Sequence, residues 1–138
     1  MDDEAIKQVL RERGHGVLSL ARDSEAYAIP VSFGYDGERA LMYLLQFGED
    51  SEKLAVASDT EQACLVTYNV ETRFEWESVI LRGSLRELPT EESEDVEAVM
   101  DENAWFPSIF PPDAPITGVH IYELVIESAS GRQGEGVV

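Results

Sequence analysis

The chain has 138 residues, and 28 Asp and Glu against 10 Lys and Arg give it a formal net charge of −18 at pH 7. Its 43% hydrophobic and 9% aromatic residues fit one folded domain over residues 1–138 and exclude a disordered acidic chain. The charge also excludes a nucleic-acid-binding surface, because no basic face is available to neutralise phosphates.

We interpret the charge as a solvated surface adapted to high internal salt, where the screening length falls to roughly 3 Å and self-repulsion weakens. An acidic protein from an ordinary cytoplasm is the alternative. The first residues, Met1-Asp2-Asp3-Glu4, do not resemble a signal peptide, and no apolar run approaches the ~20 residues that span a membrane. We therefore expect a soluble, cytoplasmic protein.

The N-terminal half begins with a predicted helix over residues 3–13 that ends at Gly14. Its apolar residues fall on one stripe, with acids at its start and Arg residues at its end. From Gly16 the hydrophobic period is two, which predicts strands over 17–21 and 27–35. We expect Asp23-Ser24-Glu25 to form the turn between them.

The pair Asp36-Gly37 then predicts a tight hairpin into a strand over 40–46. A short helix is expected over 52–58, with Asp50 or Ser51 as its cap. Strands are predicted over 62–69 and 75–88, with a bulge or bend at Gly83.

The C-terminal part is predicted to begin with a helix that starts at Pro89 and turns Val96, Val99 and Met100 inward. Four prolines make the segment 103–117 irregular. The last strand is predicted over 119–127, followed by a polar, Gly-rich tail.

About six strands in direct succession, with turns too short to cross over, favour antiparallel pairing. Together with two long helices outside the sheet, they predict a mainly β or α+β barrel rather than a parallel α/β fold.

Most familiar catalytic arrangements are missing from the sequence. His15 and His120 have no Cys or His partner at ligand spacing, which argues against a metal site. There is neither a glycine-rich phosphate loop nor a nucleophile elbow. We name no catalytic residue.

The strand over 27–35 has two contrasting faces. The bulky, core-like face carries Tyr27, Ile29, Val31, Phe33 and Tyr35, and the small face carries Ala28, Pro30, Ser32 and Gly34. Because Pro30 cannot donate a ladder hydrogen bond, we expect a free or bulged edge here. A flat ligand could rest on the small face, and close packing of a second sheet or subunit is the alternative.

Two further segments could border a ligand. In 76–88, Trp76 and Ser78 lie on one amphipathic face, which could line a pocket or form an aromatic buttress. In 48–54, Ser51 and Lys53 at a helix start could bind a phosphate. Alternatively, Lys53 pairs with nearby carboxylates at the surface.

The order of five segments, "GVLSLA", "YAIPVSFGYDG", "LMYLLQFG", "SEKLAVASDTEQACLVTY" and "WESVILRGSLREL", resembles the FMN-binding split barrels related to pyridoxamine phosphate oxidase. The resemblance implies a six-stranded antiparallel split β-barrel with peripheral helices. It also implies a homodimer with FMN at each end of the interface.

Carried over by position, the resemblance implies these contacts to FMN. The ring would lie against Ile29, Pro30, Val31 and Ser32, with Trp76, Ser78 and Val79 approaching it. Tyr43, Leu44 and Leu45 would follow the ribityl chain, and Ser51 and Lys53 would hold the phosphate.

The sequence departs from those oxidases at the phosphate end. Glu52 stands where they carry an arginine, and Leu44 where they carry a threonine. Their C-terminal substrate-binding region has no counterpart here. We therefore expect an FMN-binding flavoprotein, an oxidoreductase of unknown substrate, rather than a true pyridoxamine phosphate oxidase.

Two alternatives stay open: a non-enzymatic flavin carrier, and a cofactor-free dimeric interaction module. Trp105, Phe106 and Phe110 could wall the flavin or pack in a dimer interface.

Overall fold

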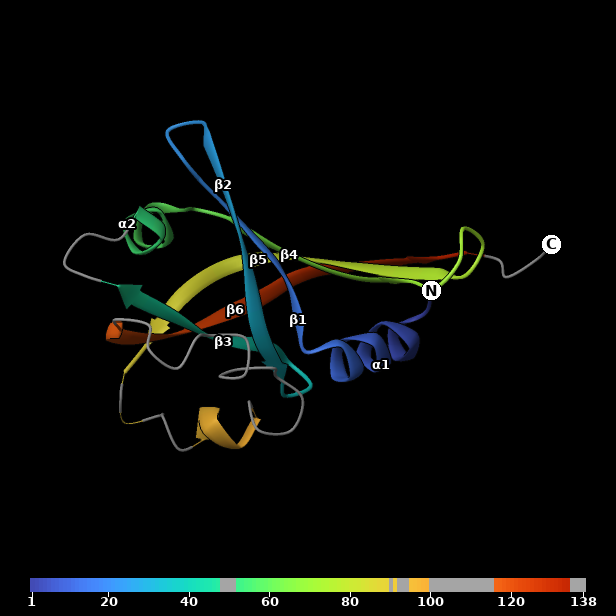
Figure 1. Cartoon of the computed structure of the whole chain (residues 1–138). Helices are drawn as coiled ribbons and strands as arrows, with labels where there is room; N and C mark the ends of the chain where they lie inside the picture. Colours follow the sequence, from blue (N-terminus) through green and yellow to red (C-terminus); the bar gives the residue numbers. More distant parts are fainter. Residues whose placement is uncertain (48–51, 90, 92–94, 100–115, 135–138) are drawn as a thin grey trace.

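The computed structural model describes residues 1–47, 52–89, 91, 95–99 and 116–134. Its strands close into an antiparallel barrel in the order β1–β2–β3–β6–β5–β4 (Figure 1). The strands are β1 (His15–Arg22), β2 (Glu25–Tyr35), β3 (Arg39–Phe47), β4 (Ala63–Val70), β5 (Trp76–Leu88) and β6 (Ile116–Gln133). The predicted mainly β, six-stranded antiparallel barrel with peripheral helices is therefore confirmed.

Helix α1 (Asp3–Arg13) has the predicted bounds, because both of its ends carry strong signals. The Asp2 carboxylate accepts a hydrogen bond of 2.8 Å from the Ala5 N–H, and Gly14 ends the helix at φ 68°. Its apolar stripe of Ile6, Val9 and Leu10 is buried. This stripe fixes α1 against the barrel.

Helix α2 (Glu52–Asp59) is one residue longer than predicted and contacts β1, β2 and β3. Val56 and Ala57 are the buried residues that join it to the core. Both candidate caps, Asp50 and Ser51, lie outside the described residues. No helix within the described ranges is long and apolar enough to cross a membrane.

The β1–β2 hairpin has a two-residue turn rather than the predicted three-residue turn. Arg22 pairs with Glu25, so Glu25 is the first residue of β2. Asp23 and Ser24 take positive φ values of 52° and 67°. Two left-handed residues match the twist of a tight hairpin, which explains why the turn is shorter.

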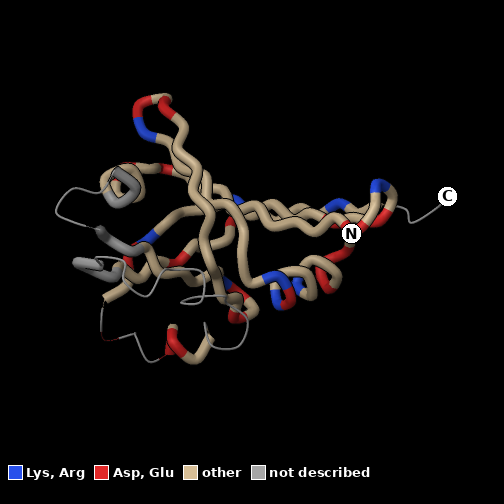
Figure 2. Tube along the Cα trace, viewed as in Figure 1, with Lys and Arg blue, Asp and Glu red and all other residues tan. Residues whose placement is uncertain are grey.

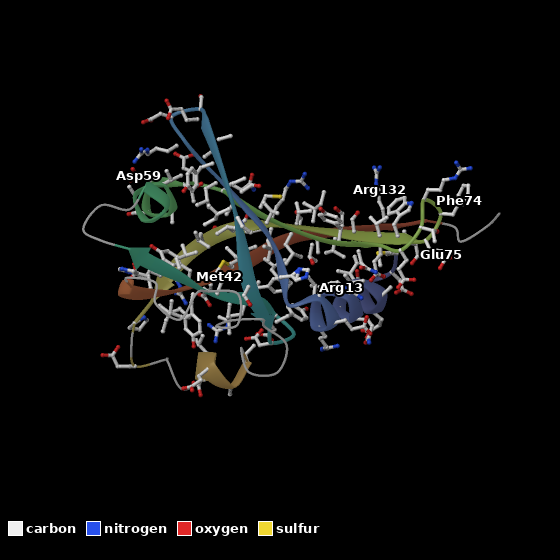
Figure 3. All side chains as sticks on the ribbon, in the orientation of Figure 1. Arg13, Met42, Asp59, Phe74, Glu75 and Arg132 are labelled. Carbon is white, nitrogen blue, oxygen red and sulfur yellow. The ribbon has the colours of Figure 1, made fainter. Side chains whose placement is uncertain are left out.

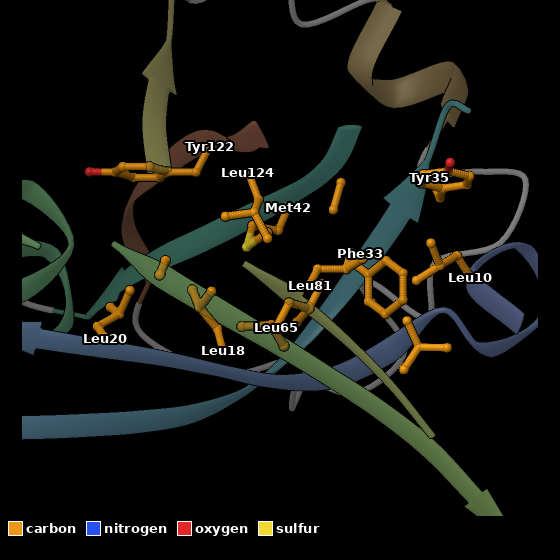
Figure 4. Packing of buried hydrophobic residues seen from close by; sticks show 14 of the residues in the cluster. Leu10, Leu18, Leu20, Phe33, Tyr35, Met42, Leu65, Leu81, Tyr122 and Leu124 are labelled. Atoms are coloured by element: carbon orange, nitrogen blue, oxygen red, sulfur yellow. The ribbon is translucent and has the colours of Figure 1, made fainter. Parts of the chain in front are cut away.

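The barrel interior holds the main core, where Phe33, Met42, Leu65, Leu81 and Leu124 lie together (Figure 4). A second cluster lies outside the barrel wall and is formed by Leu41, Leu88, Val96 and Ile121, with Tyr43 and Val99 packed against it. Residues 95–99 are helical and cover this cluster. The inward orientation predicted for Val96 and Val99 is therefore confirmed, while Met100 and 103–115 lie outside the described residues.

Strand β6 is longer than the predicted 119–127 at both ends. The polar residues 128–133 have low strand propensity, but they pair with residues 77–82 of β5. The register of this pair shifts between Arg82 and Gly83, which confirms the bulge predicted at Gly83. Pairing with β5 therefore makes a strand of residues 128–133, which the sequence predicted to form a polar tail.

Glu123 is a buried carboxylate on β6, with a side chain only 4% exposed. Its Oε2 lies 2.5 Å from a terminal nitrogen of Arg39, and Oε1 contacts Arg86. Arg39 also reaches the Asp36 carboxylate at 2.8 Å. Hydrogen bonds to Asp36 and Glu123 raise the pKa of Arg39 further above its usual value. This network ties β3, β5 and β6 together.

Candidate functional site

The barrel has an unpaired stretch between β2 and β3, which we call the split. On one side of β2, residues 25–32 pair with β1; on the other side, pairing with β3 is confined to Phe33–Tyr35. β3 pairs with β6 along its whole length, so residues 43–47 have a paired edge only on that side. Within the described residues, the edges of β2 over 25–32 and of β3 over 43–47 therefore bound the split. The free edge predicted from Pro30 is confirmed.

The small face of β2 is open at one end and filled at the other. Ala28 and Pro30 are exposed. Ser32 is buried, and its Oγ donates to the Gly14 carbonyl at 3.2 Å. A Cβ placed on Gly34 would lie 2.9 Å from Val99 Cγ1, so the covering helix occupies that position. A flat ligand therefore has room beside Ala28 and Pro30.

The bulky face of β2 packs inward, as predicted. Val31, Phe33 and Tyr35 are buried, and Tyr27 and Ile29 pack against the same core. One face of β2 is thus fixed in the core. Among the described residues, no strand pairs with its edge over 25–32 on the β3 side, so main-chain groups there are unpaired by strands. Such groups can hydrogen-bond to a bound molecule.

Most of the predicted site residues gather around the split. Ile29–Ser32 lie on β2, and Tyr43, Leu44 and Leu45 lie on β3, with α2 packed against both strands. Leu44 is buried inside the barrel, and Tyr43 is half-buried outside it. Ser51 and the side chains of Leu45 and Lys53 lie outside the described residues.

The predicted residues of β5 lie elsewhere on the barrel. β1 and β4 separate β5 from β2, and three strand spacings amount to about 14 Å. Val79 is fully buried in the core, while Trp76 and Ser78 are half-buried on the outside. Within one chain, these residues are not brought together with Pro30.

The outside of β1, β2 and β4, together with that of β5 and β6 up to the bulge at Gly83, forms one surface, which we call the outer face. Cross-strand pairs such as Pro30–Val17, Val17–Val66, Val66–Ile80 and Ile80–Ser130 define it. Its positions are Ala26, Ala28, Pro30, Val17, Ser19, Ala21, Cys64, Val66, Tyr68, Val70, Trp76, Ser78, Ile80, Arg82, Ser128, Ser130 and Arg132.

None of the outer-face positions carries Asp or Glu, although 28 of the 138 residues are acidic. Acidic residues gather instead at the tips of the hairpins and along α1 (Figure 2). Arg132 projects from the side of the β5–β6 ribbon opposite α1 (Figure 3). Tyr68 and Val70 are 57% and 61% exposed. A carboxylate-free, partly apolar surface on so acidic a chain is typical of an interaction surface.

A cluster of three titratable residues lies at the barrel end near the split, and the sequence analysis missed it. The Tyr122 hydroxyl donates to Glu87 Oε1 at 3.2 Å, and His120 Nδ1 lies 3.3 Å from Glu87 Oε2. Burial and the charge of Glu87 raise the pKa of Tyr122 to about 12. The signal available in the sequence was Glu87, an acid at an inward-facing position of its strand.

Two surface cavities among the described residues lie away from the split. One of about 570 Å³ adjoins the β1–β2 turn and is lined by Asp23, Asp59 and Glu61 among others. The other, of about 340 Å³, lies beside Trp76 and Arg13. The candidate site is thus an open strand edge and not a closed pocket of the described chain.

The sequence matches the pyridoxamine 5'-phosphate oxidase family model over residues 2–133, which is nearly the whole chain. The protein belongs to the pyridoxamine 5'-phosphate oxidase family. The resemblance to this family, inferred from the order of the five segments, is confirmed. No curated protein matches the sequence significantly.

Solved structures of similar fold include flavin-binding proteins. An FAD-binding protein from Mesorhizobium loti has a TM-score of 0.78 at 19% identity, over 98% of this chain and 96% of that one. The FAD and heme binding protein from Mycobacterium smegmatis has a TM-score of 0.73 at 15% identity, over 97% and 72%. The flavocytochrome Anf3 from Azotobacter vinelandii has a TM-score of 0.68 at 16% identity, over 96% and 67%. At these identities the likeness establishes the family's fold.

Proposed function

We propose that this member of the pyridoxamine 5'-phosphate oxidase family is a flavoprotein that binds FMN at the split and acts as an oxidoreductase of unknown substrate. The observation that carries the proposal is the free edge of β2 beside the exposed Ala28 and Pro30. The flavin-binding proteins among its structural neighbours support it.

In this proposal the chain binds and orients the flavin, and the flavin supplies the electron-transfer chemistry. Main-chain groups of Ile29–Ser32 would hold the ring, with Pro30 contributing a carbonyl and no N–H. Tyr43, Leu44 and Leu45 would follow the ribityl chain. Ser51 and Lys53 would bind the phosphate, as the resemblance implies.

The proposal predicts that protein purified in high salt is yellow, with the absorption bands of an oxidised flavin. A spectrum before and after adding FMN tests it, and a parallel titration with FAD identifies the preferred flavin. Ala28→Leu should weaken binding about tenfold, because the larger side chain fills the open part of the small face. Ala26→Leu, nearer the turn, is the matched control. A colourless protein that takes up neither flavin contradicts the proposal.

A cofactor-free dimeric module is the second candidate, and the filled end of the small face favours it. Ser32 already donates to Gly14, and Val99 occupies the space above Gly34. Flavin uptake excludes this candidate. If flavin binds, steady-state turnover with NADPH and an electron acceptor separates an enzyme from a flavin carrier.

We also propose that the protein is a homodimer that associates through the outer face. Two chains of charge −18 repel each other, so the carboxylate-free surface is where they approach at least cost. A second copy would also bring Trp76 of the partner subunit to a flavin held at Pro30. This arrangement would account for the distance between the two groups of predicted residues within one chain.

Ile80→Glu places a carboxylate in the middle of the outer face and should convert the dimer to a monomer. Gln8→Glu, at an exposed position of α1 on the opposite side of the β5–β6 ribbon, adds the same charge and should leave the dimer intact. Light scattering after size exclusion measures both, in high and in low salt. The wild-type dimer should weaken in low salt, where repulsion is less screened. A wild-type monomer under all conditions would contradict the assembly.

A further inference from the structure

Strand β4 has an unpaired stretch over residues 67–70, which we call the β4 edge. β1 pairs with β4 only from Cys64 to Val66, whereas β5 pairs with the other side of β4 as far as Val70. Among the described residues, no other strand pairs with this side, and no loop forms a backbone hydrogen bond with residues 68–70. The β4 edge therefore presents main-chain groups with which a further strand can pair.

The main-chain groups of Tyr68 and Val70 point to this edge. A Cβ placed on Gly16 of β1 would lie 2.4 Å from the Val66 carbonyl oxygen, so that oxygen faces the β1 side of β4. In an antiparallel strand, the N–H and C=O of one residue point to one side and those of the next residue point to the other. The groups of Tyr68 and Val70 therefore point the same way as those of Val66, and the groups of the residues between them face β5.

The β4 edge lacks the protection that exposed strand edges usually carry. Of the six strands that the structure describes, β4 alone contains no Asp, Glu, Lys or Arg, in a chain whose residues are 28% charged. Tyr68 and Val70 are also the most exposed large apolar side chains among the described residues. The free edge of β2 contains Pro30, whereas β4 contains no proline. Because native proteins protect bare edges with charge or proline, we expect the β4 edge to be covered.

We propose that the β4 edges of two copies of the chain pair with each other, antiparallel and centred on Asn69, and so join two sheets. In this register Tyr68 lies opposite Val70 of the partner subunit, and the two residues exchange both main-chain hydrogen bonds. An aromatic residue opposite a β-branched one stabilises an antiparallel sheet. A two-fold axis repeats this pair, because the same patch of both copies meets.

Charge and length both fit a second copy. Two chains of charge −18 repel each other, so they approach at less cost through a strand without carboxylates. In the proposed register Glu71 lies opposite Thr67 of the partner subunit and not opposite another acid. The free stretch has the same length in both copies, so the pairing ends at the same point in each. This interface uses main-chain groups in the plane of the sheet, unlike the outer-face dimer, and it does not depend on flavin binding.

Hydrogen exchange of the full-length protein in high salt, followed by NMR at low and high protein concentration, tests the pairing. The N–H groups of Tyr68 and Val70 should exchange about tenfold more slowly in concentrated protein, because carbonyls of the second copy accept from them. Those of Thr67 and Asn69, which face β5, should be protected at both concentrations. Ile80→Glu, which disrupts the outer-face dimer, should keep the concentration-dependent protection.

Two variants at one position act on the β4 edge itself. Tyr68→Pro removes an N–H from the edge and leaves the bonds to β5, and Tyr68→Glu keeps that N–H but adds a negative charge. Both should abolish the concentration-dependent protection at Val70. Val125→Glu makes a similar change at an exposed apolar position on β6, two strands away from β4, and should retain it.

Three results would overturn the inference. One is exchange at Tyr68 and Val70 that does not change with concentration in the wild type. Another is protection at Val70 in Tyr68→Glu equal to that of the wild type. The third is loss of the protection in Ile80→Glu, which would assign it to the outer face. Failure to bind a flavin would contradict the proposed function alone and leave this pairing standing.

Discussion

Replacing Gly83 with alanine should destabilise the protein by about 3 kcal/mol, at the upper end of what overpacking usually costs. A Cβ at this position would lie 1.8 Å from the Val125 carbonyl oxygen and 2.8 Å from its carbon. Both contacts are with backbone atoms of β6 at the bulge, so neither can move without breaking the β5–β6 ladder. Chemical denaturation in high salt measures the loss.

Gly131→Ala is the matched control on the same pair of strands. Its Cβ would meet Met1 Sδ at 2.6 Å and Ile6 Cγ1 at 2.9 Å. These contacts are with side chains and not with backbone, and the nearer one is with the flexible side chain of the terminal Met1, so the loss of stability should be smaller. Equal losses for the two variants would show that the bulge does not require a glycine.

Replacing Arg39 with methionine should cost about 3 kcal/mol of stability, the lower end of the range for breaking a buried ion pair. The substitution leaves the 4% exposed Glu123 carboxylate with Arg86 alone, whose side chain is 65% exposed. It also removes the 2.8 Å contact with Asp36. The same denaturation measurement applies.

Two further variants isolate the cause of this loss. Arg22→Met breaks an ion pair with Asp59 in which the two side chains are 35% and 57% exposed, and it should cost about 1 kcal/mol or less. Adding Glu123→Gln to Arg39→Met should recover part of the loss, because it removes the poorly paired buried charge. If Arg39→Met costs no more than Arg22→Met, Glu123 does not depend on its arginine partner.

The sequence predicted the parts of the fold whose signals are local. α1 begins at an acidic cap and ends at a left-handed glycine, so its bounds were readable to the residue. The β2–β3 hairpin follows from Asp36-Gly37, and Gly37 takes φ 101°. Gly83 was readable as a bulge because it interrupts the alternating apolar positions Val79, Leu81 and Leu85 of the strand.

The strand 128–133 was missed because nothing local favours it. Its residues are small and polar, and β5 supplies the pairing that makes them a strand. The buried Glu123 was missed for a related reason: its partners Arg39 and Arg86 come from two other strands. Such contacts depend on register, which a single sequence does not reveal.

The candidate site also has features that were predictable from local sequence and features that depend on strand pairing. The free edge of β2 was predictable, because a proline in a strand interior excludes one set of ladder bonds. The contact of His120 with Glu87 was not predictable, since 33 residues separate them. The absence of carboxylates from the outer face becomes visible only when the strand order β2–β1–β4–β5–β6 is known.

The unpaired edge of β2 also has a consequence for how separate chains associate. Bare strand borders are templates on which foreign strands can add, and they promote aggregation. Pro30 places a residue without an N–H in the middle of this border, so an incoming strand would find its ladder interrupted there. The mutual repulsion of chains with charge −18 acts in the same direction. Both features therefore oppose aggregation of the chains through the unpaired edge of β2.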